Sequence, residues 1–426
     1  MPVNRSTSKR TENRAQGGLR LALLLMALLL AAPLSLAGCS LRGTPTPEPA
    51  SITFAYPEVD SPRYQVLLEE FNELYPHITV ELRPKRYDML GGISAGDADV
   101  FVSSQFALNW LQGESQIRAL TPLIEQDETF DRSDFYPGTL ELYTREGEVW
   151  AIPAGVDIMV MYTHRDLFEA NGMPEPEIGW TWDDFYATTL SLRDPTADVF
   201  GYAPALDLFD PLTFIYQHGG RIFDDLENPT RTTFDDPLTV EALEWYSDLI
   251  FDENVAPTPE QAEAFGRGGV RAGIYRDKVA VWTGMLSERG GRGWPTEWPM
   301  RWGVVTLPRD AEAATLTLIE GYYISAQTDQ PDASWKWLAF LSAKLPNRQT
   351  PVRRSLAEGF AYEEQVGGEV AEVARASLDG ALLLSPELAE FEEALGLFEQ
   401  ALRAIMDQRS TPMEAMNWAQ QQSKFR

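Results

Sequence analysis

Strand and helix patterns alternate along residues 52–102, and this order limits the possible folds more than any other feature of the chain. A short apolar stretch at 52–55 precedes a segment, 61–75, in which apolar side chains recur at helical spacing. Apolar and polar residues then alternate over 78–82, and a further apolar stretch covers 99–102. A strand–helix–strand order predicts a parallel sheet with helices on its faces, so we expect an α/β protein.

The alternation continues to the C-terminus. A long strand-like run at 149–162 is interrupted by Pro153 and Gly155, and Thr181 with Asp184 has the pattern of a capping box at the start of a helix. The remaining predicted elements are strands at 301–308 and 321–326 and helices at 241–250, 331–343 and from 386 onward. A chain of this length, with 44% hydrophobic residues, suits two or three globular domains.

The N-terminus has the pattern of an export signal. Basic residues gather in residues 1–20, an apolar run follows at 21–32, and the tetrapeptide LAGC ends at Cys39, the single cysteine. The run is shorter than the ~20 residues that a membrane-spanning helix needs. LAGC resembles the lipobox of bacterial lipoproteins. The resemblance implies that residues 1–38 are removed, and that Cys39 carries a lipid anchor in the cell envelope, on the outer face of the cytoplasmic membrane or in the periplasm.

Residues 39–50 are rich in proline and threonine, which predicts an extended tether between the anchor and the folded part. The formal net charge of the chain is −29. Nucleic-acid binding needs lysine and arginine on the phosphates, so a surface this acidic excludes that class of partner. It also disfavours anionic ligands and leaves neutral or cationic solutes as the natural candidates.

Several segments, in order and across nearly the whole chain after the tether, resemble the extracellular solute-binding proteins of ABC importers in the maltose-type cluster. These segments are residues 71–82, 94–104, 147–185, 217–225, 236–249, 302–308 and 321–326. The resemblance implies a two-lobed periplasmic-binding-protein (type II) fold, in which each lobe is a mostly parallel sheet flanked by helices. It also implies a monomer that captures a small solute by lobe closure, and that delivers it to a membrane permease served by a separate ATPase.

The lobes are expected to be built from discontinuous parts of the chain. We expect an N-terminal lobe of 51–157 plus 306–345 and a C-terminal lobe of 158–305 plus 346–426. The hinge crossings would fall near 156–158, 304–306 and 345. Ligands of open α/β sheets bind outside the carboxyl ends of strands, often between domains, so the loops at these ends are the expected site.

The solute is expected to be a sugar or an oligosaccharide, because aromatic rings stack on the apolar faces of sugars while carboxylates and amides bind the hydroxyls. The resemblance favours Trp282 and Asp157, which we expect to face each other from the two lobes. Most of the other aromatic residues must belong to the core. The complete set of candidate ligand-binding residues is Tyr56, Glu58, Ser103, Gln105, Asp157, Asp207, Phe209, Trp282, Gly321, Tyr322 and Arg353.

Other classes of function have weaker sequence support. The segment GISAG around Ser94 matches the pattern of a hydrolase nucleophile, but a strand is expected after it rather than before it. The histidines lie far apart and no glycine precedes a lysine, so we expect no zinc site, no nucleotide-binding loop, no cofactor and no enzyme. The sequence leaves open whether a structural calcium ion binds at one of the Asp-Asp pairs. A receptor for a polyamine, a peptide or a metal complex, and a secreted carbohydrate-active enzyme, are the alternatives.

Overall fold

The computed structural model describes residues 48–86, 93–94, 96, 98–205, 208–226, 228–291 and 297–425. Cys39 and Asp207 lie outside these residues. Ala50–Arg426 forms one compact unit. Its strands are β1 (Ala50–Pro57), β2 (Ile78–Lys85), β3 (Val100–Ser104), β4 (Thr144–Arg145), β5 (Glu148–Val149), β6 (Ile152–His164), β7 (Phe200–Ala203), β8 (Val279–Met285), β9 (Trp302–Val305), β10 (Thr315–Ile324) and β11 (Ala381–Leu383).

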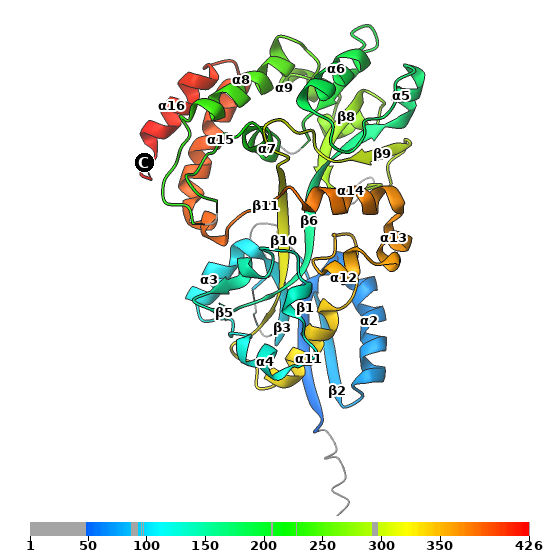
Figure 1. Cartoon of the computed structure of the whole chain (residues 1–426), viewed down its shortest axis with the longest axis vertical. Coiled ribbons are helices and arrows are strands. Elements are labelled where there is room, and N and C mark those ends of the chain that lie inside the picture. Colours follow the sequence, from blue (N-terminus) through cyan, green and yellow to red (C-terminus); the bar gives the residue numbers. More distant parts are fainter. Residues whose placement is uncertain are drawn as a thin grey trace, which may run out of the picture. The chain divides into compact units, whose positions relative to one another are not determined.

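Helices connect and cover these strands (Figure 1). They are α2 (Ser61–Leu74), α3 (Leu108–Gly113), α4 (Thr121–Gln126), α5 (Arg165–Ala170), α6 (Trp182–Leu192), α7 (Phe209–Gln217), α8 (Pro237–Phe251), α9 (Pro259–Ala264), α10 (Val270–Ile274), α11 (Pro331–Ser342), α12 (Arg354–Ala357), α13 (Phe360–Val366), α14 (Gly368–Leu378), α15 (Glu392–Met406) and α16 (Pro412–Gln422).

The main sheet of the described residues has the strand order β2-β1-β3-β10-β6-β8-β7, with β11 beside β10 and β9 beside β6. Strand β1 is parallel to β2 and β3, and β7 is parallel to β8, as the strand–helix–strand order predicts. Strand β10 runs antiparallel to both β3 and β6, so the sheet is mixed at its centre. The helix at 61–74 and the capping box of Thr181 and Asp184 are also confirmed.

Strand β6 is continuous through Pro153 and Gly155, where the sequence indicated a break. The register against β10 shifts between Glu320 and Gly321, and this irregularity accommodates the proline within the sheet. A Cβ atom on Gly155 would lie 2.5 Å from Oε1 of Gln349, so the glycine also allows a neighbouring loop to approach the strand. The strand predicted at 301–308 is shorter and ends at Val305.

Strand β6 contributes to two hydrophobic cores. Successive side chains of a strand point to opposite faces. Ile158, Val160 and Tyr162 join one core, whereas Met159 and Met161 join the other. Figure 1 shows β6 and β10 running side by side between the elements that supply these cores. Trp335 and Trp337 are buried in the first core, as expected for packing residues of helix α11.

Candidate functional site

A cavity of about 520 Å³ lies at the carboxyl ends of the parallel strands β7 and β8. This is the position at which α/β sheets commonly bind ligands. We call it the aromatic cavity, because it is lined by three aromatic residues together with small and charged residues. Its lining consists of Pro204, Ala205, Ala262, Gly268, Gly269, Val270, Arg271, Ile274, Tyr275, Trp282, Thr283, Glu288 and Trp298.

Four rings form a continuous stack at the wall of the aromatic cavity. Trp282 stacks on Tyr162 with ring centres 5.8 Å apart. Trp298 packs edge-on against both rings, with its centre 5.3 Å from that of Trp282 and 4.7 Å from that of Tyr162. Trp302 packs edge-on against Trp298 at 5.6 Å. Trp282 is 2% exposed, so it belongs to the core as well as to the cavity wall. Trp298 is half-buried and therefore presents more of its ring to the cavity.

The strands position these rings through close backbone contacts. Tyr162 donates a hydrogen bond from its hydroxyl to the carbonyl of Met285 at 2.9 Å, which fixes its ring across β8. A Cβ atom on Gly284 would lie 2.9 Å from that ring, so the glycine provides the space that the tyrosine occupies. The hydroxyl of Thr283 accepts a hydrogen bond from the backbone N–H of Ala205 at 3.1 Å. The loop after β7 is thereby held against β8.

Charged and polar groups lie beside the rings. Arg271 and Glu288 form an ion pair of 3.7 Å, and both side chains are partly exposed at the cavity. Burial raises the pKa of Tyr275 above its ordinary value, so its hydroxyl stays protonated at neutral pH and can donate a hydrogen bond. The lining of the aromatic cavity therefore combines flat apolar rings with one cation, one carboxylate and the hydroxyls of Tyr275 and Thr283.

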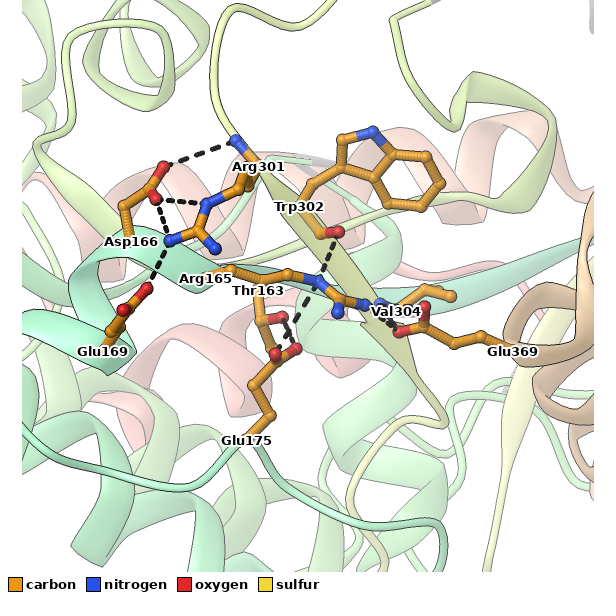
Figure 2. A network of polar contacts seen from close by, with 9 residues as sticks. All are labelled: Thr163, Arg165, Asp166, Glu169, Glu175, Arg301, Trp302, Val304 and Glu369. Carbon is orange, nitrogen blue, oxygen red and sulfur yellow. Dashed lines mark hydrogen bonds and ion pairs between the residues drawn. The ribbon is translucent and has the colours of Figure 1, made fainter.

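A second network fixes strand β9, which carries Trp302. Figure 2 shows Arg165 between the carbonyl oxygen of Trp302 and two carboxylates. Its Nε donates to that carbonyl at 2.7 Å, and its terminal nitrogen lies 2.6 Å from both carboxylate oxygens of Glu369 on α14. Glu369 also accepts from the backbone N–H of Val304 at 3.2 Å. Helix α14 and the start of α5 thus hold β9, and with it the outermost ring of the stack, in place.

Asp157 is not among the residues that line the aromatic cavity. Burial, and after it the neighbouring Asp157 carboxylate, raise the pKa of Tyr162, the ring that stacks on Trp282. That Asp157 faces Trp282 across the site stays a prediction. Asp157 is 8% exposed and accepts a hydrogen bond from the backbone N–H of Ser287 at 2.9 Å. This hydrogen bond holds the turn that follows β8.

The candidates on β1 and β3 make contacts within the protein. Tyr56 is buried, and its ring lies 4.7 Å from that of Tyr64. Glu58 is exposed in the turn after β1. The hydroxyl of Ser103 accepts from the backbone N–H of Ile93 at 3.0 Å. Gln105 is also buried, and both ends of its side-chain amide bond to backbone groups.

Gln105 donates to the carbonyl of Leu384 and accepts from the N–H of Ile319, each at 2.5 Å. Arg353 is 7% exposed, donates to the carbonyl of Ser342 at 2.9 Å and lies over the ring of Phe135 at 4.3 Å. Because the protein itself satisfies these polar groups, we do not include Gln105 and Arg353 in the proposed site.

Tyr322 on β10 lines a small hollow of about 20 Å³ near the N-terminus of α2. The hydroxyl of Tyr322 is 3.5 Å from the hydroxyl of Tyr64 and 3.5 Å from a terminal nitrogen of Arg63. At Gly321, a Cβ atom would lie 3.0 Å from the ring of Tyr143, so the glycine serves packing. Phe209 begins α7 and is half-buried in the second core. The structure therefore brings only Trp282, of the described candidates, to the aromatic cavity.

Sequence reasoning missed Tyr162, Arg271, Tyr275, Glu288 and Trp298. Trp298 had a usable signal: it lies in a segment rich in glycine, proline and tryptophan that directly follows a strand. Arg271 and Tyr275 lie on or just after α10, a helix of five residues that is too short to give a periodic pattern.

Two curated proteins similar to this chain carry the same name. The "Arabinooligosaccharide-binding protein" of Bacillus subtilis is 24% identical over 248 residues, which is 55% of each chain. The protein of the same name from Halalkalibacterium halodurans is 27% identical over 216 residues, 48% of this chain and 46% of that one. The chain thus spans about half the length of the curated relatives it matches.

Solved structures are similar over most of the chain. The Listeria monocytogenes ABC substrate-binding protein Lmo0181 in complex with cycloalternan has a TM-score of 0.72 and 21% identity, over 88% of this chain and 98% of that one. Maltose-bound MalE3 of T. maritima has a TM-score of 0.67 and 20% identity, over 88% and 99%. The fold is therefore the two-lobed type II periplasmic-binding-protein fold.

Within the described residues, every helix is too short or too polar to cross a membrane. The sequence profile of the family described as "Bacterial extracellular solute-binding protein" matches residues 57–344, more than half of the chain. The solute-binding resemblance of the sequence, the two-lobed α/β fold and this match agree, and the chain belongs to the bacterial extracellular solute-binding protein family.

Proposed function

We propose that this protein is the substrate-binding receptor of an ABC importer and that it captures a sugar or an oligosaccharide. The observation that carries the proposal is the aromatic cavity at the ends of β7 and β8, where Trp282 and Trp298 form one wall. Two relatives named for binding arabinooligosaccharides, and structural neighbours described with cycloalternan and maltose, support a carbohydrate ligand.

A cavity that is poor in aromatic rings and lined by acids would favour a polyamine. The aromatic cavity instead has three aromatic residues, and Arg271 balances Glu288. Sugar rings would stack on the tryptophans, while Glu288 and the hydroxyl of Tyr275 would bind sugar hydroxyls. Binding without chemical conversion is the expected activity.

Capture would proceed by closure of the two lobes proposed from the sequence, 51–157 with 306–345 and 158–305 with 346–426. The residues that line the aromatic cavity all lie in the proposed C-terminal lobe, so the N-terminal lobe would add its contacts on closure. A ligand that then contacts both lobes stabilises the closed state through the contacts that only this state makes. The closed monomer would then dock on the transmembrane subunits of a permease whose ATPase is a separate chain. These boundaries and partners are part of the proposal.

A thermal-shift screen tests the ligand class. The probes are arabinooligosaccharides, maltooligosaccharides, spermidine and glycerophosphocholine. A true ligand at 100 times its dissociation constant adds ~2.7 kcal/mol to stability. We expect an oligosaccharide to raise the melting temperature of the wild type, and Trp298→Ala to remove the shift. Trp418→Ala, which changes an exposed tryptophan on α16, is the matched control and should keep it. A shift with spermidine alone would contradict the proposal.

Lipid anchoring through Cys39 is a further part of the proposal. Replacing Cys39 by alanine should abolish incorporation of labelled fatty acid, because only the thiol can take the diacylglycerol group. The Ala variant should then be released from the membrane fraction or stay uncut. Fatty-acid labelling in cells followed by fractionation measures both effects. Unchanged labelling and membrane retention in the variant would show that Cys39 is not the anchor.

A further inference from the structure

A second cavity adjoins the aromatic cavity. It has a volume of about 390 Å³ and lies between α8, α9 and α15. Pro204, Ala262 and Val270 line both cavities, so the two cavities are direct neighbours. Each cavity has the volume of a typical small-molecule site, ~300–1,000 Å³.

The lining of this second cavity differs in chemistry from that of the first. Leu208, Ile250, Leu402 and Met406 contribute aliphatic or thioether surface, and three prolines add surface without a backbone donor. Its charged residues, Glu399 and Arg403, lie one helical turn apart on α15. They pair with each other at 3.5 Å, and both side chains are largely exposed. Buried Tyr246 adds a ring with one hydroxyl, so the interior is mostly apolar and the charged groups lie on the solvent side.

A glycine-rich segment contributes to the lining of both cavities. Between α9 and α10, Gly266 and Gly268 have φ angles of +100° and +114°, which only glycine adopts readily. Gly268 and its neighbour Gly269 line the aromatic cavity, and Val270, the next residue, lines both. This segment therefore supplies Val270 at the place where the two cavities meet.

We propose that the second cavity binds an apolar substituent, aryl or alkyl, of a glycoside whose sugar lies in the aromatic cavity. The inference rests on the proposed function. Most of this lining offers a sugar hydroxyl no hydrogen-bond partner in place of water, whereas an aryl or alkyl group gains from leaving water. Because the two cavities share three lining residues, one ligand with a polar and an apolar end fits this pair of neighbouring cavities.

Calorimetry with matched glycosides tests the inference. The probes are the methyl and p-nitrophenyl glycosides of α-L-arabinofuranose and of maltose, together with unsubstituted arabinotriose and maltotriose. We expect the p-nitrophenyl glycoside of the preferred sugar to bind roughly 10- to 100-fold more tightly than its methyl glycoside. Met406→Trp, which fills the second cavity from α15, should remove this gain and leave the methyl glycoside unaffected.

Two further variants separate filling of the cavity from misfolding. Gln400→Trp places the same ring on the exposed side of α15 and should keep the gain. Leu208→Phe fills the cavity from the opposite wall. If Met406→Trp does not bind the methyl glycoside, Leu208→Phe takes its place, and it should lose the gain from the p-nitrophenyl group while keeping its affinity for the methyl glycoside.

Three results would overturn the inference. If the wild type binds methyl and p-nitrophenyl glycosides with equal affinity, the second cavity does not take part in binding, and the proposed function as a sugar receptor still stands. An equal gain with the unsubstituted trisaccharide, lost in Met406→Trp, assigns the cavity to a further sugar unit. If no methyl glycoside and no trisaccharide binds, the proposed function fails and the inference fails with it.

Discussion

Replacing Gly201 by alanine should lower the free energy of unfolding by ~3 kcal/mol or more. Gly201 lies in β7, and a Cβ atom at this position would be 1.8 Å from the backbone oxygen of Thr189 in α6. That oxygen cannot rotate away as the end of a side chain could, because the helix holds it. Parallel pairing of β7 with β8 fixes the strand on the other side. Helix or sheet must therefore shift.

Urea unfolding followed by circular dichroism measures this loss. Gly113→Ala is the matched control, because a Cβ atom on Gly113 in α3 would meet nothing within 4 Å. This control should change stability by at most ~1 kcal/mol. Equal midpoints for the two variants would show that the contact between α6 and β7 is looser than the structure indicates. Since β7 ends beside the aromatic cavity, Gly201→Ala should also weaken sugar binding.

Replacing Trp282 by alanine should cost ~3–5 kcal/mol of stability. The side chain is 2% exposed and packs against Tyr162 and Trp298, so truncation leaves a void between two rings. The same change should weaken binding of the oligosaccharide found by screening by roughly 10- to 100-fold, because the stacking wall of the cavity is lost. Urea unfolding and calorimetry measure the two effects.

Trp337→Ala separates these two effects. Trp337 is fully buried against Phe54 and Phe71 in the first core. We expect this variant to lose comparable stability and, below its unfolding temperature, to keep wild-type affinity. Unchanged affinity in Trp282→Ala would remove Trp282 from the site and leave it a core residue. A loss of affinity in both variants would mean that the assay reports unfolding.

Features of the fold that depend on neighbouring residues were predictable from the sequence. The capping box of Thr181 and Asp184 involves residues three positions apart, and both of its hydrogen bonds are present. The parallel pairing of β1 with β2 and β3 follows from the strand–helix–strand order. The central antiparallel position of β10 could not be predicted in the same way, because its partners lie far away in the chain.

The candidate site was less predictable, because a polar residue after a strand has no local sign of its partner. Gln105 bonds to Leu384, 279 positions away, and Arg353 pairs with Asp134, 219 positions away. Both had the sequence position of ligand-binding residues and are buried by distant segments. Trp282 lies at the cavity because strand ends meet at one sheet edge, a regularity that the sequence does reveal.

The place of β10 in the sheet has a consequence during synthesis. Its partner β3 ends at Ser104, whereas β10 begins at Thr315, 211 residues later (315 − 104). At ~5–20 residues per second, the ribosome needs roughly 10 to 40 s to supply the strand that joins β3 to β6. During this interval the exposed edges of β3 and β6 can pair with other chains. Late arrival of the central strand thus delays closure of the sheet until most of the chain has been made.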